Sequence, residues 1–457
     1  MKHSINLLLA TSFLPISVFS ANNEKPNIIF ILADDLGYGD LGCFGNKIIQ
    51  TPHIDKLAEE GISFTDCYAG ASVSSPSRCT LMTGLHTGHS RIRGNMCRVG
   101  GVEGVREGMG TVRRVNLQPQ DSTIANVLSD NGYITCLVNK WHLDGFDLNA
   151  GPLERGFDEF YGWLIHEPNS HNYYPYYRWD NREKYIIEDN LNDKKIDHNT
   201  DRATQEAIDF LRRNKKNPFF LYLAYNSPHV PLDAKSWGDY ANVDLSDNDK
   251  SYAALITHMD ECIGKVISEI NKLNLDKNTI IIFASDNGGA KAVNTEKLAL
   301  NGNLRGWKGD LYEGGIRVPM IIRMPDKLNA GKTSDFPCYF PDIMPTFTEL
   351  TNSKTNLNID GISLVPEIIK PNSLDNKKRF LYWEQYPRTG ISQAVRWENW
   401  KLIRQNTGKE FELYNLKTDE SETNNIAKQH PDIVNRLATY METAHTESEN
   451  WPVHLNQ

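Results

Sequence analysis

Short apolar runs separated by longer amphipathic stretches dominate the first two thirds of the chain. The clearest runs are rich in β-branched and aromatic residues, and each breaks abruptly into polar sequence, as buried parallel strands do. They cover residues 27–33, 133–138, 219–224 and 279–284. The pattern therefore predicts a sheet whose central strands are parallel and buried on both faces.

Four further segments have the apolar period of helices that lie against a sheet. They cover residues 51–61, 121–130, 202–213 and 251–273. The first opens with Thr51 and Pro52 and closes with Gly61, an order of capping residue, first-turn proline and terminal glycine that favours a helix between them. Strands that alternate with helices indicate the α/β class, here a large, mostly parallel sheet sandwiched by helices.

The pattern changes near residue 370. Strand candidates at 380–384, 391–397, 400–404 and 411–415 follow one another through short polar turns, and residues 432–446 have a helical pattern. Short connections favour antiparallel pairing. We therefore expect a catalytic domain over residues 21–370 and a smaller α+β subdomain with an antiparallel sheet over residues 371–457. A chain of 457 residues is long enough to bury a core of this size.

The first 20 residues are typical of an export signal. Lys2 precedes an apolar stretch over residues 5–19, and the small residues Ser20 and Ala21 come before polar sequence. We expect residues 1–20 to be a cleaved signal peptide and the mature protein to be exported, either periplasmic or secreted. No cysteine follows the apolar stretch, which argues against a lipid anchor, and no later stretch is long enough to predict membrane insertion.

Charge and cysteine usage exclude two kinds of site. The 49 basic and 58 acidic residues give a formal charge of -9, which is not the footprint of a nucleic-acid-binding protein. The seven cysteines lack the spacing of a zinc site, and we expect most of them to be buried free thiols. An anionic ligand would therefore need local cationic side chains.

Polar side chains follow all four apolar runs at the point where each run ends. These endings are Asp34-Asp35, Asn139-Lys140-Trp141-His142, Asn226-Ser227-Pro228-His229 and Asp286-Asn287-Gly288-Gly289. In doubly wound sheets, ligands bind beyond the carboxyl ends of the strands. Any one ending could serve a turn, because such junctions favour Asp and Asn. The occurrence of polar groups at all four ends favours a shared site.

Two of these endings predict a metal site. Asp34, Asp35, Asp286 and Asn287 offer only oxygen ligands, which suits a hard divalent cation and argues against zinc or copper. Three carboxylates are costly to bury together unless a cation neutralises them. Calcium tolerates irregular oxygen cages better than magnesium does, so we expect one calcium ion. The alternative is that these residues serve as turn and cap residues.

A compact motif lies at residues 74–84, Ser-Ser-Pro-Ser-Arg-Cys-Thr-Leu-Met-Thr-Gly, in which Ser74 stands four residues before Arg78. This spacing resembles the signature of the type I sulfatases, which belong to the alkaline phosphatase superfamily. The strand endings match that family as well, and the resemblance extends over residues 25–450. The family's Gly-Lys-Trp-His-Leu-Gly motif stands here at residues 139–144 with Asn139 and Asp144 in place of both glycines.

The resemblance implies a mechanism. Ser74 would be oxidised after synthesis to formylglycine by a maturation enzyme that accepts serine, and the hydrated aldehyde, bound to calcium, would attack the sulfur of a sulfate ester. Arg78 would hold the modified side chain. The family's sulfate-binding and acid-base positions match four further residues, Lys140, His142, His229 and Lys308. His229 or Lys308 would protonate the leaving alcohol, and His142 would take a proton from the second hydroxyl.

Two polar stretches have the composition of loops around a pocket mouth. Residues 89–95 include Arg93 and Asn95, and residues 166–179 include His171 and Asn172. We expect these four to bind substrate, although ordinary surface loops would have the same composition. The substrate would be a sulfated carbohydrate, a host or algal glycan, attacked from its end.

Two other functions fit parts of this pattern. A phosphatase or phosphodiesterase of the same superfamily would share the sheet, but such enzymes commonly need two transition metals and more metal-ligating histidines than we can place here. A binding protein without catalysis is the other alternative, and an unmodified Ser74 would produce that state.

Overall fold

The computed structural model describes residues 25–106, 109–164, 172–293, 295–387 and 390–452. The expected signal peptide, residues 1–20, lies outside the described residues, and so does His171. Within the described ranges, no helix is both long enough and apolar enough to cross a membrane. All seven cysteines are free and six of them are buried, which confirms the expectation of buried thiols.

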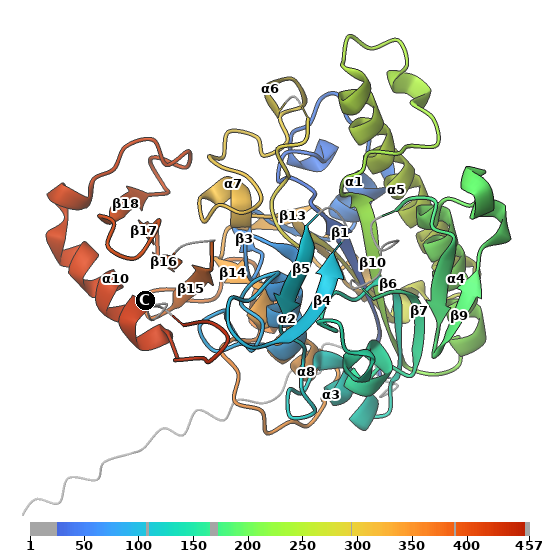
Figure 1. Ribbon diagram of the computed structural model, residues 1–457, viewed down its shortest axis with the longest axis horizontal. Coiled ribbons are helices and arrows are strands. Elements are labelled where there is room, and N and C mark those ends of the chain that lie inside the picture. Colours follow the sequence, from blue (N-terminus) through green and yellow to red (C-terminus); the bar gives the residue numbers. More distant parts are fainter. Residues whose placement is uncertain (1–24, 107–108, 165–171, 294, 388–389, 453–457) are drawn as a thin grey trace, which may run out of the picture.

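The predicted strands form the centre of a ten-stranded sheet (Figure 1). They are β1 (Asn27–Asp34), β6 (Ile134–Lys140), β10 (Phe219–Pro228) and β11 (Thr279–Ser285), and β7 (Glu159–Trp163) joins them as a fifth parallel strand. The order at the centre is β11-β1-β10-β6-β7. Every residue of β1, β10 and β11 is buried, as expected for strands covered on both faces.

The outer strands of the sheet are short and mixed in direction. One edge carries β12 (Met320–Arg323), β2 (Ile62–Phe64) and β13 (Lys332–Ser334), and the other carries β8 (Tyr177–Asp180) and β9 (Glu183–Ile186). β12 runs antiparallel to β11, and β8 runs antiparallel to β7. The sheet is therefore mostly parallel at its centre and mixed at its edges.

Helices cover both faces of the sheet, which confirms the predicted sandwich. One face packs against α1 (Pro52–Glu59), α4 (Asn199–Asn214) and α5 (Asp247–Lys272). The other face packs against α2 (Ser74–Thr83), α3 (Ile124–Asp130), α8 (Ile343–Leu350) and α9 (Val365–Ile369). Capping boxes at Thr123 and Ser246 fix the starts of α3 and α5, which explains why these starts differ from the predicted ones.

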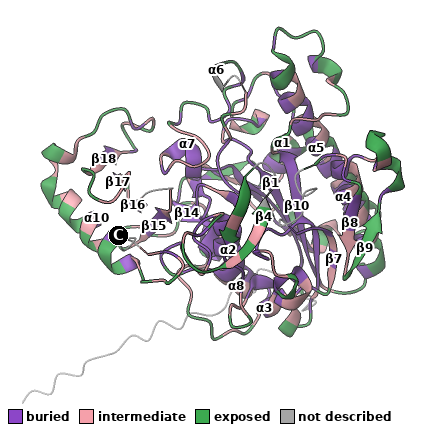
Figure 2. Ribbon diagram, in the orientation of Figure 1, coloured by how far each residue is buried: buried purple, intermediate pink, exposed green. Residues whose placement is uncertain are grey.

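The carboxyl-terminal strands form a separate antiparallel sheet, as predicted. Its order is β15 (Phe380–Gln385), β16 (Ser392–Trp397), β17 (Trp400–Arg404) and β18 (Glu412–Asn415). One face of this sheet packs against the main body, where Trp383 contacts Tyr68. The other face packs against α10 (Pro431–Ala444). The outer side of α10 is exposed, whereas the central strands of the large sheet are buried throughout (Figure 2).

The remaining elements are short. Two small sheets pair β3 (Cys67–Tyr68) with β14 (Cys338–Tyr339) and β4 (Val102–Arg106) with β5 (Gly110–Arg114). The short helices are α6 (Thr295–Leu298) and α7 (Glu313–Ile316). Single 3-10 turns lie at Gly42–Phe44, Leu148–Ala150, Pro152–Arg155, Glu188–Asp193, Gly238–Tyr240, Asp276–Asn278, Pro325–Lys327, Phe340–Asp342 and Ala427–Gln429.

Buried ion pairs join the two sheets. Lys401 of β17 lies 2.8 Å from a carboxylate oxygen of Glu313 in α7 and 2.9 Å from one of Glu422, and all three side chains are fully buried. Arg93 pairs with Glu384 of β15 at 2.7 Å. These contacts fix the small sheet against the body that carries the predicted site.

Candidate active site

Helix α2 places Ser74 against the carboxyl ends of the central strands. Ser74 is the first residue of α2, and its hydroxyl donates a hydrogen bond of 2.5 Å to Oδ2 of Asp286, directly after β11. Arg78 lies one helical turn later on the same face, as the four-residue spacing predicts. Its guanidinium donates to Ser74 Oγ at 2.9 Å and to Asp286 Oδ2 at 2.8 Å. The three side chains form one buried cluster.

The amino-terminal end of α2 is held by neighbouring loops. The backbone amide of Ser75 donates to Oδ1 of Asn95 at 3.0 Å, and the hydroxyl of Ser75 donates to the carbonyl of His142 at 2.8 Å. Glycine is required at position 70, because a Cβ atom there would lie 1.6 Å from Oγ1 of Thr80 in α2. This close approach seats the helix so that Ser74 reaches Asp286.

The acidic residues after β1 lie beside Asp286 and Asn287. The backbone amide of Asp35 donates to Asp286 Oδ1 at 3.1 Å, and Asn287 Nδ2 donates to Asp35 Oδ1 at 2.8 Å. Asp35 has a positive φ of 66°, a strained conformation for a residue with a side chain. The predicted oxygen ligands are thus neighbours in space.

Two buried oxygens in this group lack a hydrogen-bond donor among the described residues, namely Oδ1 of Asp34 and Oδ1 of Asn287. Buried polar atoms are normally paired, so unpaired oxygens beside further carboxylates indicate a missing positive partner. An all-oxygen donor set of this kind fits a hard divalent cation. Asp34 and Asp35, together with His229, are also close enough to share one metal ion.

Cationic side chains surround the carboxylates. Lys140 Nζ lies 2.6 Å from Oδ2 of Asp34, and Lys308 Nζ lies 2.7 Å from Oδ2 of Asp35. Burial alone would raise the pKa of both acids, but Lys140 lowers that of Asp34 and Lys308 lowers that of Asp35 below the usual value. Both aspartates are therefore anionic.

The two lysines respond differently to their surroundings. Burial lowers the pKa of Lys140, and the charge of Asp34 only partly offsets this. For Lys308, burial also acts to lower the pKa, but Asp35 and Asp34 outweigh it and raise the pKa above the usual value. Lys308 is thus held as a cation more firmly than Lys140.

The two predicted histidines have different partners. Nε2 of His229 lies 3.6 Å from Oδ2 of Asp35, and burial lowers the pKa of His229. Nε2 of His142 lies 3.0 Å from a guanidinium nitrogen of Arg114. Arg114 ends β5 and is buried. Sequence reasoning missed it, because the hairpin of β4 and β5 has no apolar run and Arg114 stands in no motif.

The structure places three of the four predicted substrate-binding residues, and their role in binding stays a prediction. Arg93 is buried, and its guanidinium pairs with Glu384 and donates to the carbonyl of Thr446. It links the segment after α2 to the small sheet. Asn95 accepts from the start of α2, so it too supports the helix. Asn172 is exposed and accepts a hydrogen bond from the amide of Tyr174, as in a local turn.

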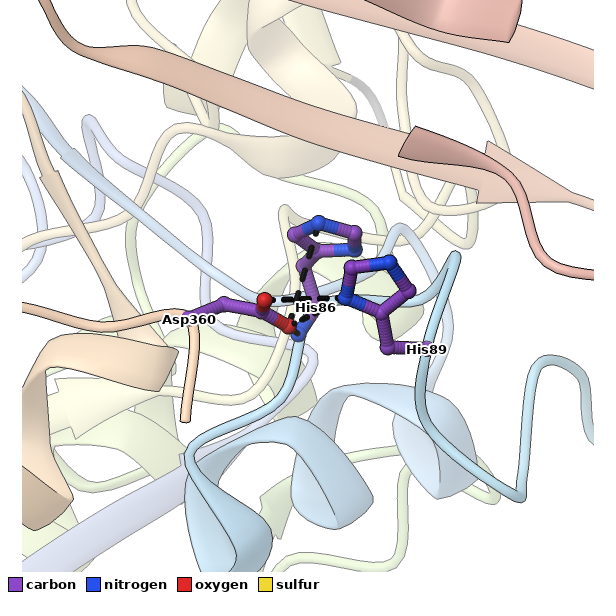
Figure 3. A group of neighbouring side chains, drawn as sticks. All are labelled: His86, His89 and Asp360. Carbon is purple, nitrogen blue, oxygen red and sulfur yellow. Dashed lines mark hydrogen bonds and ion pairs between the residues drawn. The ribbon is translucent and has the colours of Figure 1, made fainter. Parts of the chain in front are cut away.

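A second histidine cluster includes His86 and His89, which follow α2 in the chain (Figure 3). Asp360 accepts from the backbone amide of His86 at 2.9 Å and lies 2.9 Å from Nδ1 of His89, and the two imidazole rings stack at 4.2 Å. Nδ1 of His86 accepts from the amide of Gly88, so this neutral ring carries its proton on Nε2. Burial lowers the pKa of His86 to about 4. The cluster ties the segment after α2 to residue 360.

Comparison with solved structures defines the class of protein. A structure described as Ps i-CgsB in complex with k-i-k-neocarrahexaose aligns with a TM-score of 0.81 and 32% identity, over 94% of this chain and 95% of that one. The fold is the alkaline phosphatase-like fold of the sulfatases. A phosphonate monoester hydrolase from Agrobacterium radiobacter shares it at a TM-score of 0.66 and 18% identity, over 92% of this chain and 95% of that one.

Sequence comparison identifies the family. The sulfatase family model matches residues 26–353, and a model described as N-sulphoglucosamine sulphohydrolase, C-terminal, matches residues 306–447. The chain belongs to the sulfatase family and is a sulfuric ester hydrolase, which confirms the resemblance seen in the motif of Ser74 and Arg78. Sulfatases generally use a formylglycine and a divalent metal, which agrees with the oxygen-rich cluster described above.

Curated relatives cover most of the chain. N-acetylgalactosamine-6-sulfatase of Mus musculus is 31% identical over 81% of this chain and 71% of its own length. N-acetylgalactosamine-6-O-sulfatase of Bacteroides thetaiotaomicron is 29% identical over 93% of this chain and 94% of its own. Arylsulfatase J of Mus musculus is 29% identical over 92% of this chain and 75% of its own.

Proposed function

We propose that this sulfatase hydrolyses sulfate esters of a carbohydrate through a formylglycine formed from Ser74, with the help of one calcium ion. One observation carries the proposal. The Ser74 hydroxyl lies 2.5 Å from a carboxylate oxygen of Asp286 and 2.9 Å from Nε of Arg78. The hydroxyl group that would become the aldehyde is therefore already placed between the proposed cation-binding oxygens and a permanent positive charge.

The ligands of the calcium ion would be Asp34, Asp35, Asp286 and Asn287 together with residue 74. Two of their oxygens have no hydrogen-bond partner among the described residues, as a cation site requires. A bound divalent cation would lower the free-energy cost of ionising a hydroxyl beside it. Calcium is favoured over magnesium because the oxygens come from three separate segments in an irregular arrangement.

The cationic side chains of the site have distinct tasks in this proposal. Arg78 is fully buried and holds the oxygen on residue 74 in place. Lys140 and Lys308 place two ammonium groups beside the carboxylates, where they would bind the non-bridging oxygens of the sulfate group.

The two histidines would move protons. His229 lies beside Asp35 and would protonate the leaving alcohol, with Lys308 as its neighbour. Arginine can only donate hydrogen bonds, so the bond from Arg114 requires an unprotonated Nε2 on His142. The lone pair of Nε2 on His142 therefore faces Arg114, and His142 would take a proton from residue 74 at this nitrogen in exchange for that hydrogen bond.

The names of the relatives support a carbohydrate substrate. Two are sulfatases of N-acetylgalactosamine, and the structure at 32% identity holds an oligosaccharide. We propose a sulfated glycan attacked from its end. The amino-terminal segment supports export to the periplasm or beyond, and a serine at position 74 requires a maturation enzyme that accepts serine.

Mass spectrometry of the peptide that contains residue 74, from protein made in its native host, tests the proposal. Oxidation of the serine to the aldehyde removes two hydrogens and lowers the mass by about two units. Active enzyme is expected to carry this change, and Ser74→Ala is expected to abolish turnover of sulfated mono- and disaccharides. Ser77→Ala is the matched control, because Ser77 is a buried alcohol on the same helix. Full activity with unmodified serine would contradict the mechanism.

A further inference from the structure

An ion pair spans the carboxyl end of β10. In the sheet, β10 lies between β1 and β6, yet Lys140 at the end of β6 reaches Asp34 at the end of β1 at 2.6 Å. The strand between them ends in an irregularity, because Leu32 pairs with Ala224 while Asp34 pairs with Pro228. Residues 225–227 therefore end the strand that lies between the strands of the aspartate and the lysine.

The direction of the side chains in this segment follows from their contacts. The hydroxyl of Tyr225 lies 2.8 Å from Thr204, and that of Ser227 lies 3.1 Å from Thr200; both partners belong to α4. Successive strand residues point to opposite faces. Asn226 therefore points to the α2 face, the face from which Ser74 and Arg78 enter the site.

The same face of β10 is already in contact with Arg78. The hydroxyl of Tyr222, four residues before Asn226 and hence on its face, lies 3.5 Å from a guanidinium nitrogen of Arg78. A further guanidinium contact reaches the carbonyl of Lys140 at 3.3 Å. Asn226 thus lies near the end of β10, on the face that contacts Arg78. The strands on either side of β10 end at Asp34 and Lys140, which form the ion pair.

The side-chain amide of Asn226 has no partner. The residue is 1% exposed, and neither its Oδ1 nor its Nδ2 makes a hydrogen bond to any of the described residues. Its backbone carbonyl, by contrast, accepts from the Tyr173 hydroxyl at 3.3 Å. An unpaired buried amide destabilises a fold, and an apolar side chain of the same size would avoid that cost. The amide is therefore suited to a ligand that enters the site.

We propose that Asn226 is a further substrate-binding residue, whose Nδ2 donates hydrogen bonds to a non-bridging oxygen of the sulfate group. This inference rests on the proposed function. Sulfate oxygens only accept hydrogen bonds, and Nδ2 offers two donors without adding charge. Arg78 and Lys140 already carry the positive charge at this point. A neutral donor near these two charges would help to fix the orientation of the bound sulfate group.

Two variants and one control test the inference. Asn226→Leu keeps the volume and removes the amide, and Asn226→Asp keeps the shape and places a negative charge where the sulfate would bind. Ser227→Ala is the control, because Ser227 belongs to the same segment but faces α4. The measurements are kcat/KM on a sulfated saccharide, inhibition by inorganic sulfate, and the rise in Tm that inorganic sulfate produces.

Asn226→Leu is expected to lower kcat/KM by about 100-fold and to abolish the sulfate-dependent rise in Tm, while Tm without sulfate stays equal or increases. Asn226→Asp is expected to lower kcat/KM more than the leucine variant does. Ser227→Ala is expected to have the same kcat/KM and sulfate response as the chain without substitutions. Unchanged kcat/KM and unchanged sulfate binding in either Asn226 variant would overturn the inference. The inference would also be overturned if the leucine variant had a lower Tm without sulfate while the aspartate variant still bound sulfate.

The Tm measurement uses sulfate alone, so it does not depend on turnover. If Ser74→Ala keeps full activity, the proposed function fails whatever the Asn226 variants do. If Ser74→Ala is inactive and both Asn226 variants are fully active, only the role of Asn226 fails.

Discussion

Arg114 donates a hydrogen bond to Nε2 of His142 over 3.0 Å, and both residues are buried. The contact joins the hairpin of β4 and β5 to the loop after β6, so a residue outside every recognised motif orients a proposed general base. Loss of this bond would free the imidazole to take another tautomer or rotamer. We expect Arg114→Gln to lower kcat by about tenfold to a hundredfold, measured by steady-state kinetics on a sulfated saccharide.

Arg113→Gln is the matched control for this prediction. Arg113 belongs to the same strand, but its side chain is exposed and pairs with Glu103 at 2.8 Å on the surface. Its replacement is expected to leave kcat within about twofold, because exposed ion pairs contribute little. Equal losses from both variants would show that the hairpin acts through its fold and not through His142.

Removal of calcium is expected to lower both activity and stability. A chelator would leave the carboxylates of Asp34, Asp35 and Asp286 without their proposed cation, and a ligand that binds only the folded state stabilises it by about 2.7 kcal/mol at a hundredfold excess over Kd. Thermal unfolding with added calcium, magnesium or zinc measures the effect, and calcium is expected to give the largest rise in Tm. No rise with calcium, or a larger one with zinc, would contradict the oxygen-rich site.

The ion pair of His258 and Asp201 predicts a pH-dependent stability. Burial lowers the pKa of His258, but its hydrogen bond to Asp201, at 2.9 Å, and its interaction with Cys262 together outweigh this, and the pKa rises from 6.5 to about 9. Lys235 and Lys265 also face Asp201. Because the pKa of His258 is higher in the folded state, the ion pair stabilises the fold. This contribution to the free energy of unfolding is complete below pH 6.5 and is lost as the pH rises through 9.

The contribution amounts to about 3 kcal/mol, and denaturant unfolding across this pH window measures it. His258→Gln is expected to be less stable at the acidic end and to lose little more on the way to the alkaline end. If the chain without substitutions and the glutamine variant lose stability in parallel as the pH rises from 6.5 to about 9, His258 is not the group responsible.

Lys401 is expected to be essential for the attachment of the small sheet. Lys401→Met would leave Glu313 and Glu422 buried without their cation, at a cost of about 3–5 kcal/mol in the free energy of unfolding. Burial already raises the pKa of Glu422 to about 7, so this acid depends on the lysine for its charge. Lys417→Met is the control, because Lys417 is exposed in the turn after β18; its cost is expected to stay below about 0.5 kcal/mol. Denaturant unfolding compares the two.

The centre of the fold could be predicted because its elements are long and buried on both faces. The apolar runs that became β1 and β11 are continuous, and the amphipathic pattern of α5 is long. Outer strands such as β2 and β13 are only three residues long, so no period can show in them. Their pairing depends on tertiary contacts. The domain boundary at residue 370 stays a prediction.

The site could be predicted where function concentrates residues at strand ends. Asp35 and Asp286 lie at the ends of apolar runs, so topology alone brought them together. The substrate-binding role of Arg93 stays a prediction, because a polar loop composition does not distinguish a residue that faces a pocket from one that holds a buried carboxylate such as Glu384. Arg114 could not be found, since its partner is 28 residues away in another segment.

One replacement near the end of β6 has a consequence for the history of the site. Asn139 has a φ of 83°, a region that glycine enters freely and that asparagine tolerates better than most residues. Its side chain now accepts hydrogen bonds from Trp163 and Asn199. A change between glycine and asparagine at this position keeps the backbone path, so a lineage can acquire or discard these side-chain links without rebuilding the loop that carries Lys140 and His142.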